Sequence, residues 1–115
     1  MALLAEVSLM VLLEFSVSPL GKGDSVSPYV ARSLKLIAAS GLDYRLHAMG
    51  TIIEGELDQV LKVLADCMAA MAEDCDRVTC TAKLDYRAGH SGRLQSKVQS
   101  VLEKVDGPLK TLDDG

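Results

Sequence analysis

The sequence has few aromatic residues and no excess of positive charge. Its 115 residues include no tryptophan, one phenylalanine and three tyrosines, and the formal net charge is −4. A nucleic-acid-binding protein needs a basic surface that displaces phosphate counterions, and RNA-binding sheets carry grouped aromatic side chains. The composition therefore argues against nucleic acid as a partner.

Metal-binding motifs, disulfide frameworks and membrane segments are also lacking. The three cysteines, Cys67, Cys75 and Cys80, form no C-x-x-C pair, which indicates reduced thiols and no metal site. No run of residues approaches the ~20 apolar positions of a membrane span. The apolar start of the chain has no basic region before it and is interrupted by Glu6, so it is not typical of a signal peptide. We expect a cytoplasmic protein without a metal or a cofactor.

What the sequence does contain is clear hydrophobic periodicity. Apolar residues alternate in two segments and repeat at helical spacing in three others. Ser27 is predicted to cap the first helix, with Pro28 at its first position and Gly41 just past its end. The predicted strands are 9–17, 43–48, 51–54 and 77–87, and the predicted helices are 28–40, 56–72 and 94–105.

This order of elements predicts one domain of the α+β class. The pattern is β-α-β-β-α-β with an additional C-terminal helix, which is typical of a ferredoxin-like sandwich. Such a domain has a four-stranded antiparallel sheet with both main helices on one face. The other face stays open unless the terminal helix or a second subunit covers it.

The strand at 77–87 predicts which side of the sheet is polar. Strict alternation places Val78, Cys80, Ala82, Leu84 and Tyr86 inward. The open face then receives a mixed set of polar side chains, namely Glu14, Ser16, Arg45, His47, Glu54, Arg77, Thr79, Thr81, Lys83 and Asp85. Such a face is either simply solvated or suited to a ligand held between two sheets.

No catalytic residue is predicted from these side chains. Glu54 and Asp85 would form an acid–base pair if they lay close together, but no nucleophile motif or phosphate-binding glycine loop accompanies them. Surface ion pairs explain these carboxylates equally well. A single histidine on a strand, His47, is more often a hydrogen-bonding residue than a catalyst.

Four strings together resemble the thiamine-binding protein family of small ferredoxin-like domains. They are EFSVSPLG at 14–21, SPYV at 27–30, YRLHAMGTIIEG at 44–55 and KLDYR at 83–87. The resemblance runs from about Met10 to Val105. It implies a domain at 10–106, an N-terminal extension at 1–9 and a flexible tail at 107–115.

The resemblance also implies a ligand and a site. Members of the family pair through their sheets into homodimers or homotetramers, and some bind thiamine or a related pyrimidine. Carried over by position, the ligand contacts are expected at Ser16, His47, Thr51, Glu54 and Lys83 or Asp85. An apolar or aromatic wall is expected from Tyr44 or Met49.

Three functions are weighed on this basis. The leading hypothesis is a non-enzymatic protein that binds thiamine or a thiamine-like compound as a homo-oligomer. The alternative is a structural or regulatory assembly domain whose open sheet makes only subunit contacts. An acylphosphatase-like hydrolase ranks last because that enzyme needs an asparagine, and this sequence has none.

Overall fold

The computed structural model describes residues 9–111 and contains four strands and three helices. In chain order these are β1 (Met10–Pro19), α2 (Ser27–Ala39), β2 (Asp43–His47), β3 (Gly50–Glu56), α3 (Leu57–Ala72), β4 (Val78–Tyr86) and α4 (Arg93–Leu102). The predicted extension at 1–9 lies, apart from its last residue, outside the described residues. Within residues 9–111, no helix has the length and apolarity that a membrane crossing requires.

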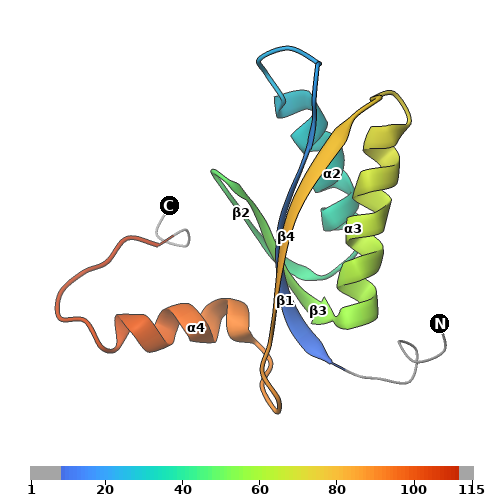
Figure 1. Ribbon diagram of the computed structural model, residues 1–115. Coiled ribbons are helices and arrows are strands. Elements are labelled where there is room, and N and C mark those ends of the chain that lie inside the picture. The colour runs from blue at the N-terminus through green and yellow to red at the C-terminus, as the bar shows by residue number, and fades with distance from the viewer. Residues whose placement is uncertain (1–8, 112–115) are drawn as a thin grey trace.

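The four strands form one antiparallel sheet in the order β2-β3-β1-β4. Helices α2 and α3 pack on one face, and α4 lies on the opposite side, projecting away from the sheet (Figure 1). This confirms the predicted ferredoxin-like α+β architecture, including the additional C-terminal helix.

The hydrophobic core lies between the sheet and the helices α2 and α3. Alternate residues of β1 point into it, and Leu13 at its centre is fully buried together with Ile53 on β3. Ile37 of α2 and Met71 of α3 close it from the helix side. The alternation of β1 therefore fixes which face of the sheet is covered.

The starts of the two main helices differ from each other and, in one case, from the prediction. Helix α2 has Val26, and not Ser27, as its N-cap residue, so the predicted serine cap is wrong. Pro28 still lies in the first turn, where its missing N–H is harmless. Helix α3 begins with a capping box in which the Glu56 and Gln59 side chains each accept a backbone N–H from the other residue.

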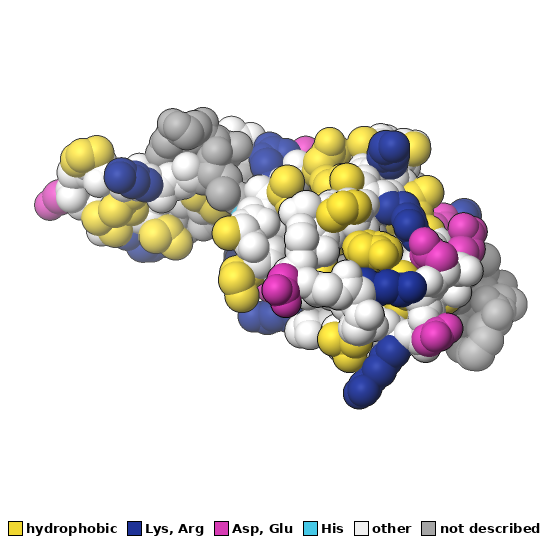
Figure 2. All heavy atoms as spheres, turned by 90° about the horizontal axis from the view of Figure 1, so that it is seen from above, with side chains coloured by type: hydrophobic (Ala, Val, Ile, Leu, Met, Phe, Trp, Pro, Cys, Tyr) yellow, Lys and Arg dark blue, Asp and Glu magenta, His cyan; other side chains and the backbone are white. Residues whose placement is uncertain are grey.

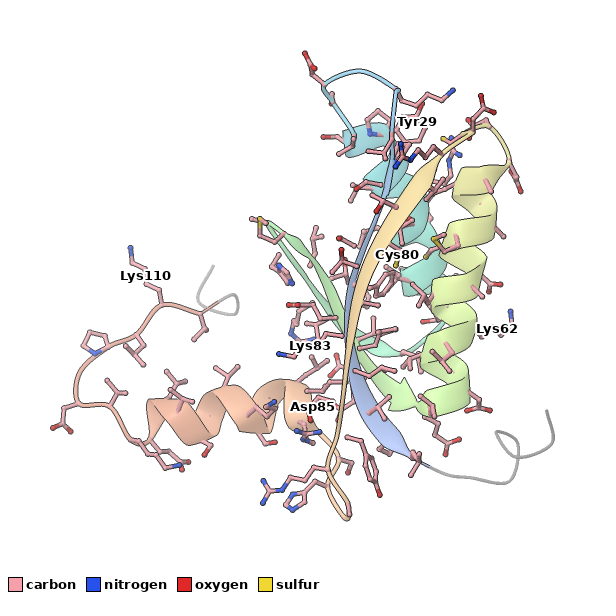
Figure 3. The ribbon with its side chains drawn as sticks, viewed as in Figure 1. Tyr29, Lys62, Cys80, Lys83, Asp85 and Lys110 are labelled. Atoms are coloured by element: carbon pink, nitrogen blue, oxygen red, sulfur yellow. The ribbon has the colours of Figure 1, made fainter. Side chains whose placement is uncertain are left out.

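Helix α2 is also joined to the turn after α3 by an ion pair at the rim of the core. The Arg32 guanidinium donates to both carboxylate oxygens of Asp74, at 2.7 and 3.1 Å, and to the carbonyl of Ala70 at 3.0 Å. It also lies over the ring of Tyr29, 5.3 Å from its centroid (Tyr29 is labelled in Figure 3). The hydrogen bonds from Arg32 lower the pKa of Asp74 to about 2.

Strand β4 is less buried than its alternation predicted. Its apolar residues do face the helix side, because Leu84 pairs with Leu13 and Tyr86 with Val11. However, Leu84 is 46% exposed and Tyr86 51%, and Ala82 is exposed as well. The prediction that these residues are buried is wrong because β4 is an edge strand, and α3 lies mainly over the central strands.

Candidate functional site

One end of the sheet is hollowed because β1 is longer than its neighbour. Phe15 is the last β1 residue with a partner on β3, opposite Thr51, while β1 continues along β4 to Pro19. The β3-side edge of residues 16–18 therefore has no strand partner among the described residues. A pocket of about 180 Å³ lies there, between this edge, the β2–β3 hairpin and α2.

The walls of this pocket are mostly apolar. They come from β1 and the sheet-facing side of α2, with Phe15, Val17, Val26, Val30, Leu34 and Ile37. The polar lining residues are Ser16, Ser18, Ser33, His47 and Thr51. No Asp, Glu, Lys or Arg lines the pocket, so its interior is apolar with a few neutral or titratable hydrogen-bonding groups.

The β2–β3 hairpin approaches β1 closely because it contains Gly50. A Cβ atom at Gly50 would lie 2.8 Å from the carbonyl oxygen of Phe15, closer than a real side chain can approach. The glycine thus permits the hairpin to form one wall of the pocket. Met49, at the tip of the hairpin, is 84% exposed and lies at the mouth.

His47 is held by its neighbours in a defined tautomer. Its Nδ1 accepts a hydrogen bond from the backbone N–H of Met49 at 3.2 Å. In a neutral ring the proton is then on Nε2. Nε2 lies 3.2 Å from Glu14 Oε2, on the open face of the sheet, but this contact does not have hydrogen-bond geometry, and Nε2 is buried without a hydrogen-bond partner.

A second unpartnered polar atom belongs to α2, on the helix side of the sheet. Ser33 is 6% exposed, and its Oγ is buried with no hydrogen-bond partner. In residues 9–111, Ser33 Oγ and His47 Nε2 are the buried side-chain polar atoms that lack such a partner, and both residues line this pocket. A buried unsatisfied polar group costs about 1–3 kcal/mol, so Ser33 Oγ is a group in the pocket that a polar ligand can complete, whereas His47 Nε2 lies beside Glu14 on the open face.

Of the eight predicted ligand residues, four line this pocket. These are Ser16, His47, Met49 and Thr51. Tyr44 instead packs against the hydrophobic core, on the helix side of the sheet. Lys83 lies on the open face as the cross-strand neighbour of Glu14, and Figure 3 shows it and Asp85 on the side where α4 lies, opposite Cys80.

The other two predicted residues anchor α4. Glu54 is buried, and its carboxylate accepts the backbone N–H groups of Arg93 at 2.9 Å and Leu94 at 3.5 Å, at the helix N-terminus. Asp85 accepts from the Arg93 guanidinium at 2.9 Å and from Lys97 at 2.5 Å. Lys97, followed by Arg93, lowers the pKa of Asp85. These two carboxylates are bound to α4 and do not face each other as an acid–base pair.

Sequence reasoning missed Ser33, although the sequence contains a signal for it. Ser33 lies three residues after Val30 and four before Ile37, on the apolar side of a predicted helix. A serine at that spacing is either bonded to its own helix or available to a ligand. Residues 9–111 contain no group of three or more His, Cys, Asp or Glu that could hold a metal ion.

Comparison with known proteins gives concordant results. A family model described as thiamine-binding protein matches residues 13–102. The UPF0045 protein of Methanocaldococcus jannaschii is 36% identical over 93 residues, which is 81% of this chain and 93% of that relative. Its crystal structure has a TM-score of 0.77 at 35% identity and covers 82% of this chain and 97% of that one.

A second solved structure shares the fold at lower identity. It is that of a Thermotoga maritima protein proposed to act in thiamine biosynthesis or salvage, with a TM-score of 0.71 and 20% identity. The match covers 80% of this chain and 98% of that one. At this identity the likeness is one of fold.

Proposed function

Because the chain belongs to the thiamine-binding protein family, we propose that it is a non-enzymatic protein that binds thiamine or a related pyrimidine or thiazolium compound. The observation that carries this proposal is the mostly apolar pocket at the end of β1, where the buried Ser33 Oγ lacks a hydrogen-bond partner. The proposed contacts are Ser16, His47, Met49 and Thr51 around the pocket and Lys83 on the open face. Glu54 and Asp85 already bind α4, and Tyr44 belongs to the core.

The protein is proposed to act as a homodimer or homotetramer that pairs through its sheets. A pocket of about 180 Å³ is smaller than the ~300–1,000 Å³ of sites that enclose a whole drug-sized ligand. The rest of the ligand would extend onto the open face, where a second copy can cover it. Residues 10–106 are proposed as the binding domain, with 1–9 as an extension and 107–115 as a tail. The three free cysteines agree with a cytoplasmic location.

Calorimetric titration of the folded oligomer with thiamine tests this function. We expect saturable binding that His47→Ala weakens by roughly five- to thirtyfold, through the loss of one hydrogen bond and of ring contact. His90→Ala is the matched control, because His90 is exposed and does not line the pocket. If the oligomer binds no thiamine at millimolar concentration, the proposed function is wrong.

A second function is favoured by a different observation. Several apolar side chains of α4 and the segment after it are exposed, and hydrophobic side chains gather along this projecting arm (Figure 2). Such an arm suits a structural or regulatory assembly domain that uses its open sheet only for subunit contacts. In that case His47→Ala changes the oligomer size in light scattering. An unchanged oligomer that has lost thiamine binding would contradict this alternative.

A further inference from the structure

Strand β4 has an outer edge that no strand occupies. The strand order pairs β4 with β1 alone, so the backbone groups along its other edge have no strand partner within residues 9–111. In Figure 1, β4 lies in front of β1, and no described helix crosses over it. The Arg93 side chain donates to the Asp85 carbonyl at 3.4 Å, but a carbonyl oxygen can accept a second hydrogen bond. An open edge of this length is a template for another strand.

The helix side of this edge carries apolar side chains that are only half covered. Helix α3 lies over the first half of β4, where Val78 and Cys80 pack against the core. Further along, Ala82 is exposed, and Leu84 and Tyr86 are 46% and 51% exposed. Three neighbouring apolar positions beside an open edge indicate a surface that a second strand covers.

The sequence of β4 is complementary to an antiparallel copy of itself. With a two-fold axis at Leu84, this residue lies opposite its own copy, and Ala82 lies opposite Tyr86, a small side chain facing a large one. On the open face of the sheet, Lys83 of each copy lies opposite Asp85 of the other. All three exposed apolar positions then face one another, and the opposite charges face one another as well.

The neighbouring registers lack this match. A two-fold axis at Lys83 places two lysines directly opposite each other, which is destabilising. An axis at Ala82 places Leu84 opposite Cys80, which already packs against the core of its own chain. The apolar row and the charges therefore favour the axis at Leu84.

The charged pairs select the register more than they add affinity. A lysine on an edge strand often prevents pairing, but in this register Lys83 meets a carboxylate. Asp85 is partly exposed and already binds Arg93 and Lys97. An ion pair in such a setting contributes little net free energy, whereas two opposed lysines disfavour the wrong register.

We propose that β4 pairs with β4 of a second copy about a two-fold axis at Leu84, so that the two sheets join into one continuous sheet. The axis is perpendicular to the sheet, so the α2 and α3 helices of both copies lie on one face and both open faces lie on the other. This inference rests on the homo-oligomer of the proposed function and names its edge and register. No β4 residue lines the pocket at the end of β1, so pairing and ligand binding can be tested separately.

Disulfide cross-linking of the full-length protein tests the register. With oxidised glutathione, Leu84→Cys should give a covalent dimer, because directly opposite residues of antiparallel strands have Cα atoms about 4.5–5.5 Å apart, within reach of a disulfide. Ala82→Cys is the matched control, since the two copies of residue 82 lie four residues apart along the strands, roughly 14 Å. The unmodified protein, with its three free cysteines, controls for cross-links at native thiols.

A second variant measures the affinity without a covalent bond. Leu84→Lys places two lysines opposite each other and removes two half-exposed leucines from the interface. We expect the dimer to weaken by roughly thirtyfold or more in sedimentation velocity. Val98→Lys is the matched control, because Val98 is similarly exposed, at 42%, but lies on α4. Circular dichroism should show that both variants are folded.

The outcomes separate the strand pairing from the ligand. If Ala82→Cys cross-links and Leu84→Cys does not, the assigned register is wrong. If neither cross-links, or if Leu84→Lys assembles like the unmodified protein, β4 is not the paired edge, and the calorimetric titration with thiamine still decides the ligand. A Leu84→Cys dimer in a protein that binds no thiamine would support the pairing and overturn the proposed ligand.

Discussion

The two faces of the sheet are both partly covered by helices, but by different interactions. On one face, α2 and α3 bury a continuous apolar core around Leu13 and Ile53. On the other face, α4 is attached through its first turn, where Glu54 and Asp85 bind Arg93. Apolar packing is non-directional and spread over many contacts, whereas the attachment of α4 depends on a few oriented polar groups.

Adjacent residues on β3 show the contrast most directly. Ile53 and Glu54 are both buried and pair with neighbouring residues of β1, yet they point to opposite faces. Ile53 is stabilised by the removal of apolar surface from water. Glu54 is tolerated because the backbone N–H groups at the start of α4 bind its carboxylate. The core face should therefore determine global stability, and the open face should determine where α4 sits and what else binds.

The largest effect is expected from a cavity on the core face. Leu13→Ala removes a fully buried side chain and should lower the free energy of unfolding by about 2–5 kcal/mol, measured by chemical denaturation. Leu84→Ala is the matched control on the same face, since Leu84 is the cross-strand partner of Leu13 but is exposed. Equal losses for the two variants would mean that Leu13 and Leu84 do not differ in burial in solution.

The next effect separates the open face from the core. Glu54→Gln removes the negative charge at the N-terminus of α4. It also replaces one carboxylate oxygen by an NH₂ group, which cannot accept a hydrogen bond from the backbone N–H of Arg93 or Leu94. We expect a loss of about 1–3 kcal/mol that appears mainly as faster amide hydrogen exchange in α4, with β1 and α3 unchanged. Glu103→Gln, at the C-terminal end of the same helix, should have little effect. Uniformly faster exchange throughout the sheet would show that α4 and the core unfold together.

Acid should weaken both the α2–α3 contact and the α4 contact. The pKa of Asp74 is lowered to about 2 by Arg32, and the pKa of Asp85 is lowered by Lys97 and Arg93. Because each folded-state pKa lies below the unfolded value, each stabilising contribution is complete above the unfolded pKa and is lost as pH falls through the folded one. For Asp74 this window runs from about 4 down to about 2.

The measurement is an NMR titration of the aspartate carboxyl carbons. Both carboxylates are solvent-accessible, so we expect a smaller change in stability than for the two preceding variants. Arg32→Gln should return the Asp74 midpoint to the ordinary aspartate range and leave that of Asp85 unchanged. A normal Asp74 midpoint in the unmodified protein would show that the ion pair with Arg32 does not persist in solution.

The core face was predictable from the sequence because its signals are local and repeated. The alternation in β1 and the helical spacing in α3 each place several apolar residues on one side of an element. The predicted order of elements and the predicted covered face of the sheet were therefore both correct. The exposure of Leu84 was not predictable, because alternation identifies the face of a residue but not whether a helix reaches it. The N-cap at Val26 was missed because the position of a cap depends on where the preceding loop turns.

The candidate site was predictable only in part, because it depends on tertiary structure. The hairpin string containing His47 and Met49 lies at the end of the sheet where the structure has a pocket. The role of Glu54 could not be inferred, since Arg93 is 39 residues away and only the fold brings the two together. The role of Asp85 was missed because its contact with Arg93, eight residues away, depends on how the loop before α4 turns. Ser33 was missed because a polar residue on an apolar helix side shows no special role until its hydrogen bonds are known.

The smallest effect on the single chain, and the sharpest test of the open face, concerns Val101. This residue is 57% exposed on α4, so Val101→Ser should change the stability of one chain by less than about 0.5 kcal/mol. If the protein is the assembly domain of the alternative proposal, a second copy buries this side of α4, and the same substitution should weaken assembly by about tenfold, since it removes roughly 1.4 kcal/mol of apolar burial. Sedimentation velocity over a range of concentrations measures the shift, and Gln95→Ser on the same helix is the polar control. If Val101→Ser and Gln95→Ser assemble alike, the apolar side of α4 is simply solvated, and assembly must rely on the sheet instead.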